Sequence, residues 1–476
     1  MNKKLELTIT IDFGSTYTKV AAFDLESERL ISAAQSKTTV DTDITTGLHK
    51  ALDRLAGQIS HTPCEIKRML ASSSAAGGLQ MVAIGLTKAL TTKAAQEAVL
   101  GAGAKLIGTY SFRLTQEDVA EIEEKAPDII LLAGGTDGGN EKNVIHNAAI
   151  LSDSAIQAPI IVAGNRNASL QVETILREKG KRYFVSRNIM PELNTLNIAP
   201  TQQIIREIFI NQITEAKGLN RAHKLVGDII MPTPSAVLKA AELLSKGTPE
   251  EPGIGDLLVV DIGGATTDIH SIGAGHPADA ATILKGLPEP HEKRTVEGDL
   301  GIRFNADSIL EQVGMDALLG KRIELGYQPA SESEIADYIE KISQNVEYLP
   351  SGTFESSLDI CLSNKAVEIA SCRHAGVIET MSSPTGSYKV QRGKDLSGFT
   401  AVIGTGGILA KSLNPETIMK AALYNHQYGE KLLPVSPSFL IDSQYILHSI
   451  GLLEAVSPTK ALRILKKNLR QCLSSN

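Results

Sequence analysis

Two short loops carry residues that could bind a phosphorylated ligand. Residues 12–19 read Asp-Phe-Gly-Ser-Thr-Tyr-Thr-Lys after the apolar stretch 7–11, and residues 261–268 read Asp-Ile-Gly-Gly-Ala-Thr-Thr-Asp after the apolar stretch 257–260. Because glycine has no Cβ, backbone N–H groups in such a turn can approach a polyphosphate closely. The hydroxyls can add hydrogen bonds, and an Asp at a strand end can hold hydrated Mg²⁺. Two such loops, far apart in the chain, predict two similar lobes that face one nucleotide.

Each loop needs strands on both sides to hold it, and the sequence predicts these strands twice. Around the first loop we expect strands at 7–12, 18–24, 29–35 and 66–72, and a helix at 46–58. Around the second we expect strands at 257–261, 268–272 and 399–403, and a helix that begins at Ile408. Each half then ends with a strand that leads into a helix, at 228–241 and at 438–452. The layout is therefore duplicated although the residues differ.

A third glycine loop follows the last of these sets of strands. Residues 401–409 read Ala-Val-Ile-Gly-Thr-Gly-Gly-Ile-Leu, a strand that runs into a turn and then a helix. In this order the three loops resemble those of the actin, sugar-kinase and heat-shock-chaperone ATPase superfamily. The resemblance implies an α/β fold with two actin-like ATPase lobes, built as a duplicated ribonuclease-H-like fold. It also implies that ATP and Mg²⁺ are the cofactors.

The superfamily resemblance assigns a role to each residue of the three loops. Asp12 and Asp261 are the expected catalytic residues and the expected holders of Mg²⁺. The first two loops are expected to bind the phosphates through Gly14, Ser15, Thr16, Lys19, Gly263, Gly264, Ala265, Thr266, Thr267 and Asp268. The third is expected to contact adenosine through Gly404, Thr405, Gly406 and Gly407. Lys19 has the alternative of pointing into solvent from the second strand.

Two acidic residues, Glu297 and Asp299, are further candidates for the nucleotide cleft. They belong to residues 294–301, which read Arg-Thr-Val-Glu-Gly-Asp-Leu-Gly. The alternative is that Thr295 caps the start of a helix, whose positive end the two carboxylates would stabilise. For His270, a structural role is favoured over a catalytic one.

The two terminal helices of the duplicated layout are candidates for a hinge. In the superfamily two such helices cross beneath the nucleotide, and small side chains let their backbones approach. Ala236, Ala240, Ser449 and Gly451 are therefore hinge candidates, with ordinary core packing as the alternative.

The first of these helices departs from the heat-shock chaperones at its start. Those proteins carry Glu-Pro-Thr there, which helps to organise the catalytic water, whereas this chain has Thr233 before Pro234 and Ser235. A hydroxyl lacks the charge of a carboxylate, so we expect slow basal hydrolysis.

Between the two halves of the first lobe lies an additional series of elements. The expected strands are 80–85, 105–109, 128–133, 160–163 and 182–185, and the expected helices are 91–100, 116–125, 142–151 and 169–179. Apolar strands with helices between them predict an inserted, doubly wound parallel α/β domain, whose ligand or partner loops lie at the carboxyl ends of the strands. The glycine-rich loop 134–140 lies at such an end. It binds a phosphate or a partner, or it is a wide turn before a helix.

Composition narrows the class of protein. The chain has 476 residues, enough for two or three domains, and a hydrophobic content of 42% that is typical of globular proteins. A net charge of −7 argues against a nucleic-acid surface, and no apolar run is long enough to cross a membrane. Four scattered cysteines suit reduced thiols, so we expect a cytoplasmic protein.

Six stretches together resemble one family within the superfamily. They are 11–19 (IDFGSTYTK), 131–139 (LLAGGTDGG), 260–271 (VDIGGATTDIHS), 294–303 (RTVEGDLGIR), 403–409 (IGTGGIL) and 442–453 (DSQYILHSIGLL). They are similar to the glutamate mutase accessory protein family, also called the methylaspartate mutase MutL-type proteins. The resemblance implies an ATP-driven chaperone that reactivates or assembles an adenosylcobalamin-dependent mutase through ATP binding and slow hydrolysis. Its partners would be the mutase subunits, and a homodimer is left open.

The inserted region resembles a flavodoxin-like cobalamin-binding module, but it lacks the DxHxxG motif that ligates cobalamin. We therefore expect it to mimic the cobalamin-binding subunit of the mutase rather than to bind cobalamin. The expected domains are 1–78, 79–190 (the insert), 191–252, 253–437 and 438–476, where the first and third form one ATPase lobe and the fourth forms the other. Alternative functions are a small-molecule kinase that uses the same cleft and an actin-like polymerising protein.

Overall fold

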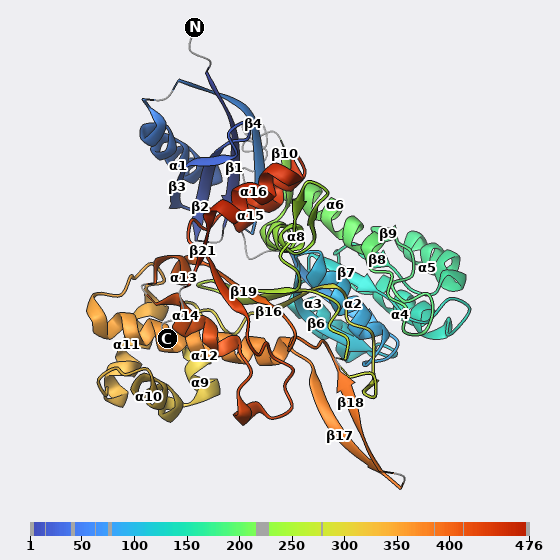
Figure 1. Cartoon of the computed structure of the whole chain (residues 1–476). Coiled ribbons are helices and arrows are strands. Elements are labelled where there is room, and N and C mark those ends of the chain that lie inside the picture. Colours follow the sequence, from blue (N-terminus) through green and yellow to red (C-terminus); the bar gives the residue numbers. More distant parts are fainter. Residues whose placement is uncertain are drawn as a thin grey trace. The chain divides into compact units, whose positions relative to one another are not determined.

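The computed structural model describes residues 4–14, 16–39, 43–61, 63–74, 79–215, 228–277, 279–384, 386–412 and 414–472 (Figure 1). The chain forms two compact units. Unit 1 comprises Met1–Leu243, Gly286–Pro290 and His448–Ile464, and unit 2 comprises Leu244–Lys285, His291–Leu447 and Leu465–Asn476. Each unit is described by itself below.

The first sheet of unit 1 has five strands in the order β10-β4-β1-β2-β3. Their bounds are β1 (Leu5–Phe13), β2 (Tyr17–Asp24), β3 (Arg29–Lys37), β4 (Cys64–Ser73) and β10 (Asp228–Pro232). β1, β2 and β3 form an antiparallel meander, whereas β4 and β10 run parallel to β1. Helix α1 (Ile44–Ile59) joins β3 to β4, and Asp43 caps its first turn. Its apolar stripe packs with alternate residues of β1, including Ile9, Ile11 and Phe13, in one core.

The main sheet of unit 2 repeats this arrangement. Its order is β16-β14-β13-β19-β20-β21, and its strands are β13 (Leu257–Ile262), β14 (Thr267–Ile272), β16 (Glu292–Glu297), β19 (Ala401–Thr405), β20 (Ser438–Asp442) and β21 (Leu469–Gln471). The first three strands form an antiparallel meander, and β19 and β20 run parallel to β13. Numbered along each half, both sheets have the order 3-2-1-4-5, and β21 adds an edge strand to the second. The duplicated α/β layout predicted from the sequence is confirmed by this strand order.

A second sheet in unit 1 is entirely parallel. Its order is β6-β5-β7-β8-β9, with β5 (Gln80–Gly85), β6 (Lys105–Ser111), β7 (Ile129–Leu132), β8 (Ile160–Val162) and β9 (Tyr183–Val185). The connecting helices are α2 (Thr91–Gly101), α3 (Gln116–Lys125), α4 (Lys142–Ser152) and α5 (Arg166–Glu178), and α6 (Ala199–Glu215) follows. Apolar clusters cover both faces of the sheet. The order 2-1-3-4-5 is that of flavodoxin-like sheets; that these residues form a separate inserted domain stays a prediction.

The two terminal helices of the duplicated layout approach closely within unit 1. Helix α8 (Thr233–Lys246) follows β10, and α15 (Leu447–Glu454) follows β20. A Cβ added to Gly451 of α15 would lie 1.9 Å from the carbonyl oxygen of Ala236 of α8, so the backbones are in contact at this point. The last helix, α16 (Pro458–Asn468), buries Leu462 and Leu465, and β21 begins directly after it at Leu469.

The remaining elements of unit 2 are helices, several of which pack on one face of its main sheet, and short strands that belong to other sheets. They are α9 (Ala306–Val313), α10 (Met315–Glu324), α11 (Glu332–Gln344), α12 (Gly352–His374), α13 (Gly407–Lys411), α14 (Pro415–Met419), η2 (Lys420–Ala422), η3 (His426–Tyr428), β11 (Gly247–Thr248), β12 (Glu251–Pro252), β15 (Ile283–Leu284), β17 (Val377–Ser383) and β18 (Gly386–Arg392). Helix α12 packs across the main sheet of unit 2, as α1 does in unit 1. Along the chain, each of these helices lies between the third and fourth strands of the main sheet of its half. The β17–β18 hairpin, orange in Figure 1, extends away from the main sheet of its unit.

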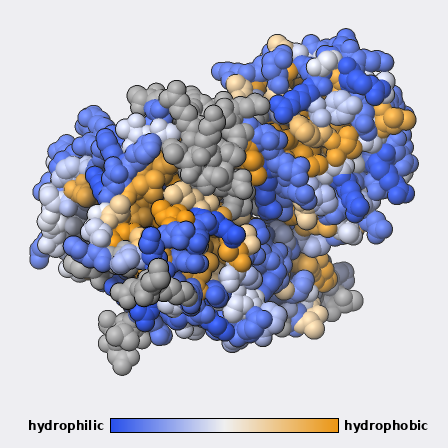
Figure 2. Space-filling model, turned by 90° about the horizontal axis from the view of Figure 1, so that it is seen from above, coloured by the Kyte–Doolittle hydropathy of each residue, from blue (hydrophilic) through white to orange (hydrophobic). Residues whose placement is uncertain are grey.

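Hydrophilic residues cover most of the face shown in Figure 2, with smaller hydrophobic areas between them. Across the described ranges, no helix combines the length and apolar character that a membrane crossing requires. The four cysteines are free thiols.

Candidate functional site

The loop between β1 and β2 is a tight turn closed by a backbone hydrogen bond of 3.1 Å from the N–H of Gly14 to the carbonyl of Tyr17. A Cβ on Gly14 would lie 2.6 Å from that carbonyl oxygen, so a side chain would force the turn open. Thr38, just after β3, holds the turn from its carbonyl side. Its hydroxyl donates to the carbonyl of Gly14 (2.9 Å), and its N–H donates to the carbonyl of Thr16 (2.9 Å). Ser15, predicted to bind phosphate, lies outside the described residues.

Asp12 lies beside this turn at the end of β1, with its carboxylate almost fully buried. Its Oδ1 accepts hydrogen bonds from the hydroxyls of Thr233 (2.5 Å) and Ser72 (3.2 Å), and its Oδ2 lies 3.3 Å from Nζ of Lys19. Lys19 is the cross-strand neighbour of Asp12 in the β1–β2 ladder, so both side chains leave the same face of the sheet. The side chain of Lys19 is 19% exposed and is turned toward Asp12 rather than into solvent.

The surroundings of Asp12 keep it ionised. Burial alone raises the pKa of a carboxyl group, but Lys19, His448 and the hydroxyl of Thr233 outweigh it and hold the pKa of Asp12 below its usual value. Burial lowers the pKa of His448 to about 4, against the attraction of Asp12. The ring of His448 is therefore neutral near pH 7, and Lys19 supplies the charge that stabilises the carboxylate there.

The turn between β13 and β14 has the same hydrogen bond, from the N–H of Gly263 to the carbonyl of Thr266 at 2.8 Å. In unit 2 the residues just before α9 do what Thr38 does in unit 1. They donate to three carbonyls of the turn: Ile302 N–H to Gly263 (3.3 Å), Arg303 and Phe304 N–H to Gly264 (3.0 and 2.9 Å), and the Asn305 side-chain amide to Ala265 (2.9 Å).

These bonds orient the N–H groups of the turn. A trans peptide is planar, so its C=O and its N–H point in opposite directions. With the carbonyls of residues 263–265 directed at residues 302–305, the N–H groups of Gly264, Ala265 and Thr266 point the other way. Successive N–H groups with a shared direction form the concave donor surface that binds phosphate. Thr267, also predicted to bind phosphate, donates its hydroxyl to the carbonyl of Leu300 at 2.7 Å instead.

The segment that braces this turn is itself anchored to the helices of unit 2. The guanidinium of Arg303 forms two parallel hydrogen bonds with the carboxylate of Asp359 on α12 (3.0 and 2.6 Å), and the hydroxyl of Tyr338 on α11 donates to the same carboxylate (2.8 Å). The close approach also needs Gly301, because a Cβ there would lie 2.3 Å from the carbonyl carbon of Ala265. A buried, bidentate ion pair therefore fixes the segment that holds the carbonyls of the turn.

The two hairpins differ in the charge beside their aspartates. In the ladders Asp12 faces Lys19, whereas the equivalent Asp261 faces Asp268. The cation near Asp268 comes from the third strand, where Arg294 lies 3.5 Å from its carboxylate. Carboxylate oxygens are ligands that suit Mg²⁺, but the role of Asp12, and of the pair in unit 2, in holding a hydrated cation stays a prediction.

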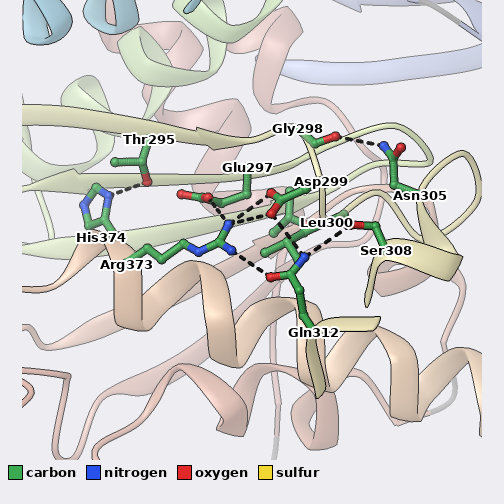
Figure 3. Close-up of polar contacts among 11 residues, drawn as sticks. Thr295, Glu297, Gly298, Asp299, Leu300, Asn305, Ser308, Gln312, Arg373 and His374 are labelled. Carbon is green, nitrogen blue, oxygen red and sulfur yellow. Dashed lines mark hydrogen bonds and ion pairs between the residues drawn. The ribbon is translucent and has the colours of Figure 1, made fainter. Parts of the chain in front are cut away.

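Glu297 and Asp299 form an ion-pair cluster with Arg373 of α12 (Figure 3). Nη1 of Arg373 lies 2.6 Å from Glu297 and 3.0 Å from Asp299, and its Nη2 donates to Gln312 of α9. Burial raises the pKa of Glu297 above its usual value despite Arg373. The alternative helix cap is wrong, because residues 292–297 form strand β16.

The strand register separates these acidic residues from the aspartates of the hairpin. Glu297 is opposite Thr267 in the ladder, and Asp261 is opposite Asp268, the next residue. Successive residues of a strand point to opposite faces, so the carboxylates of Glu297 and Asp261 leave opposite faces of the sheet. Their joint role in nucleotide binding stays a prediction.

The four residues of the third loop lie in different surroundings. A Cβ on Gly404 would meet Met419, Leu409 and Ile441 within 3.0 Å, so this glycine makes room for core side chains. Gly406 has φ +104° and lies against the backbone of Ile262, just before the turn between β13 and β14. Gly407 is exposed, and a Cβ there would meet nothing within 4 Å. Of the three glycines, Gly407 is therefore the one with open space beside its Cα, and its contact with adenosine stays a prediction.

Thr405 is buried and directed inward. Its hydroxyl donates to Oδ2 of Asp442 (3.0 Å), whose carboxylate also accepts the N–H groups of Ile446 and Leu447 (both 2.9 Å). Asp442 thereby caps α15 while it is held by the third loop. His270 is fully buried in β14, and burial with the neighbouring Arg294 lowers its pKa well below the usual value.

The structure brings the predicted residues together in two groups. Gly14, Thr16, Lys19 and Asp12 surround one turn in unit 1; Gly263–Asp268 and Gly404–Gly407 surround another in unit 2. Sequence reasoning missed the residues that hold the two turns from their carbonyl side, namely Thr38, Arg303 and Asn305. The signal for Arg303 was present in the stretch 294–303, which was interpreted through its acidic residues.

Comparison with known proteins identifies the family. The model of the MutL protein family matches residues 8–469. The chain belongs to the MutL protein family. Protein MutL of Clostridium tetanomorphum is 45% identical over 465 residues, which cover 98% of this chain and 99% of that protein. The family resemblance recognised in the sequence is therefore confirmed.

Two solved structures illustrate how distant the other similarities of this MutL family member are. The activator of 2-hydroxyisocaproyl-CoA dehydratase from Clostridium difficile, with bound ADPNP, is 10% identical, with 98% of this chain and 100% of that chain covered and a TM-score of 0.30. Plasmodium falciparum glycerol kinase with ADP is 11% identical, with 99% and 94% covered and a TM-score of 0.36. At such TM-scores the fold assignment depends on the strand order and not on these similarities.

Proposed function

We propose that this MutL family member binds ATP with Mg²⁺ through its glycine turns and hydrolyses it slowly. The observation that carries the proposal is the repeated turn: a glycine N–H bonded to the carbonyl three residues on, braced from its carbonyl side, beside an aspartate on the first strand. In unit 2 the bracing turns successive N–H groups toward a prospective phosphate. Asp12 and Asp261 would hold the Mg²⁺ and its waters, and the metal would neutralise charge on the phosphates.

The client of this ATPase is proposed from the family. A protein of the MutL family would use ATP binding and slow hydrolysis to reactivate or assemble an adenosylcobalamin-dependent mutase of the glutamate or methylaspartate type. Thr233 supports slow turnover, because its hydroxyl contacts Asp12 and brings no second carboxylate to the site. A catalytic water would then depend on Asp12 or Asp261, or on groups that a bound partner supplies.

The decisive measurement is ATP turnover by the purified chain, alone and with a mutase inactivated by cobalamin damage. We expect low basal turnover that rises when the inactive mutase is added and not when the intact holoenzyme is added. Asp261→Asn should abolish the stimulation, whereas Asp307→Asn, an exposed aspartate of α9, should leave it unchanged. Turnover that ignores the mutase, or phosphate transfer to a small-molecule acceptor, would instead favour the kinase alternative.

The parallel sheet is the proposed mutase-binding surface. We propose that it mimics the cobalamin-binding subunit of the mutase and docks through the loops at the carboxyl ends of its strands. Two of these loops, 86–90 after β5 and 133–141 after β7, flank the point where the order 2-1-3-4-5 reverses, which is where ligands bind in such sheets. The second is rigid, since the buried side chains of Asn165 and Asn188 bond to its backbone.

Charge reversal tests this surface without disturbing the core. Lys88→Glu changes an exposed residue of the first loop, and Arg177→Glu changes an exposed residue of the last turn of α5, at the opposite edge of the sheet. In a pull-down with the mutase, Lys88→Glu should weaken binding and Arg177→Glu should not. Equal binding by both variants would exclude this edge as the docking surface.

A further inference from the structure

Residues 286–290 (Gly-Leu-Pro-Glu-Pro), called the strap below, pack in unit 1 although the chain on both sides of them belongs to unit 2. Before the strap, β15 pairs with β18, and the N–H of Lys285 donates to the carbonyl of Gln391 at 2.9 Å. After it, the carbonyl of His291 accepts from the N–H of Gly273 (3.0 Å), and β16 begins at the next residue. Both ends of the strap are thus fixed in unit 2.

The middle of the strap is fixed in unit 1 by one apolar and one charged contact. Leu287 is 3% exposed and belongs to the apolar cluster formed by β5, β7, α2 and α6. The carboxylate of Glu289, almost fully buried, forms an ion pair with Lys93 of α2. A buried leucine and a largely desolvated ion pair make this a specific attachment, not an incidental contact of a loop.

The strap is continuous with the segment that braces the turn between β13 and β14. This turn, residues 263–266, is the proposed phosphate-binding turn of unit 2 and is called the phosphate turn below. It leads directly into β16, which pairs with β14 along its whole length from Glu292 to Glu297. β16 leads in turn to residues 302–305, whose N–H and amide groups hold the carbonyls of Gly263, Gly264 and Ala265. A strand paired along its length transmits a displacement without absorbing it, since its backbone hydrogen bonds would have to break first.

The other side of the attachment is helix α2. This helix begins directly after residues 86–90, at the carboxyl end of β5, where a sheet of this strand order binds its ligands. The side chain of Thr91, the first residue of α2, accepts the N–H groups of Leu86 and Thr87, at 2.6 and 3.0 Å. A movement of α2 therefore moves this loop.

We propose that the strap is a mechanical link: nucleotide binding at the phosphate turn of unit 2 displaces β16 and the strap, and the strap changes the position of α2 and of loop 86–90. This rests on the proposed function, because it takes ATP as the ligand of the turn. The link would let the nucleotide control the edge of the parallel sheet that faces a partner.

Hydrogen–deuterium exchange of the full chain, with and without Mg²⁺ and a non-hydrolysable ATP analogue, tests the link. In the wild type the analogue should slow exchange in residues 257–272 and change it in residues 86–101. In Leu287→Ala the first effect should persist and the second should disappear. Leu170→Ala, which removes an exposed leucine of α5 in the same unit, should behave as the wild type.

A charge reversal provides a second test that leaves the apolar cluster intact. Lys93→Glu and Glu289→Lys should each abolish the response of residues 86–101, and the double variant should restore it, because the ion pair is re-formed in the opposite sense. An unchanged response in Leu287→Ala and in both single variants would overturn the link, as would a wild type that responds at 257–272 but not at 86–101. Lack of any response at 257–272 would instead refute the proposed nucleotide site.

Discussion

Thr233 donates a hydrogen bond of 2.5 Å to Oδ1 of Asp12, from the first residue of α8 to the end of β1. The contact fixes the first turn of α8, a predicted hinge helix, to the carboxylate proposed to hold Mg²⁺. The threonine stands where the heat-shock chaperones are expected to have a glutamate, so a neutral donor occupies the place of a second acid. Any movement of α8 relative to the turn must break or stretch this bond.

Removing the hydroxyl of Thr233 should destabilise the protein. Thr233→Val keeps the shape but leaves Oδ1 of Asp12 with one donor fewer, and a hydrogen bond to a charged group contributes about 1.5–3 kcal/mol. We expect the free energy of unfolding in urea to fall by about 2 kcal/mol, while Thr233→Ser, which retains the donor, stays within about 0.5 kcal/mol of the wild type. Equal midpoints for the valine and serine variants would contradict a stabilising role.

The buried pair of Arg303 and Asp359 should be essential to the turn between β13 and β14, which is proposed to bind phosphate. Arg303→Met leaves Asp359 buried without its counter-charge, which costs about 3–5 kcal/mol. The loss should appear both in urea unfolding and as weaker binding of an ATP analogue in calorimetry. Arg373→Met is the matched control: its side chain is 40% exposed, so the same change should cost less than about 1 kcal/mol. Similar losses of stability in both variants would show that burial of the ion pair does not determine the cost of removing its cation.

The contact between α8 and α15 should tolerate no side chain at Gly451. Gly451→Ala places a Cβ 1.9 Å from the carbonyl oxygen of Ala236, so the helices must separate or the chain must unfold. We expect a large drop in melting temperature. Gly57→Ala, in α1, meets nothing within 4 Å and should raise stability by about 0.4–1 kcal/mol through the unfolded state. If Gly451→Ala has the same melting temperature as the wild type, the two backbones are not in contact.

Variants of the third loop should distinguish a glycine that is needed for stability from one that contacts the ligand. Gly406→Ala combines φ +104° with a Cβ 2.2 Å from the carbonyl oxygen of Ile262, so it should lower thermal stability and distort the phosphate turn. Gly407→Ala fills open space and should leave the melting temperature unchanged. If adenosine lies against Gly407, bulkier Gly407→Val should weaken binding of ATP far more than binding of inorganic triphosphate. An equal effect on both ligands would place adenosine elsewhere.

His448 should make the protein less stable as the pH falls. Its folded-state pKa of about 4 lies below the usual value of about 6.5, so the unfolded chain takes up a proton between these two values and the folded chain does not. Stability is therefore lost as the pH drops from about 6.5 to about 4, by on the order of 3 kcal/mol in all. His448→Gln removes this contribution while the buried His270 and His374 remain in both proteins. Urea unfolding at pH 7 and pH 5 should show a smaller drop for the variant; identical drops would assign the pH dependence to other groups.

Local patterns predicted the two hairpins well, for a physical reason. An apolar run followed by a glycine turn needs only its neighbours in the chain to form, so Gly14 and Gly263 were found with their strands and with the aspartates beside them. The parallel sheet was predicted for the same reason, because its strands are continuous apolar runs separated by helices. Glu297 and Asp299 were harder to place, since their partner Arg373 is distant in the chain and no local rule names it.

The sequence by itself determined the order of strands and helices along both halves and the family, since both depend on residues that are close together in the chain or on motifs in a fixed order. Only the tertiary structure decided which atoms hold the turns: Thr38 just after β3, residues 302–305 before α9, and Thr233 on Asp12. These are contacts between segments that meet only when the sheets form. Their hydrogen bonds are set by packing and peptide geometry, which no local pattern encodes.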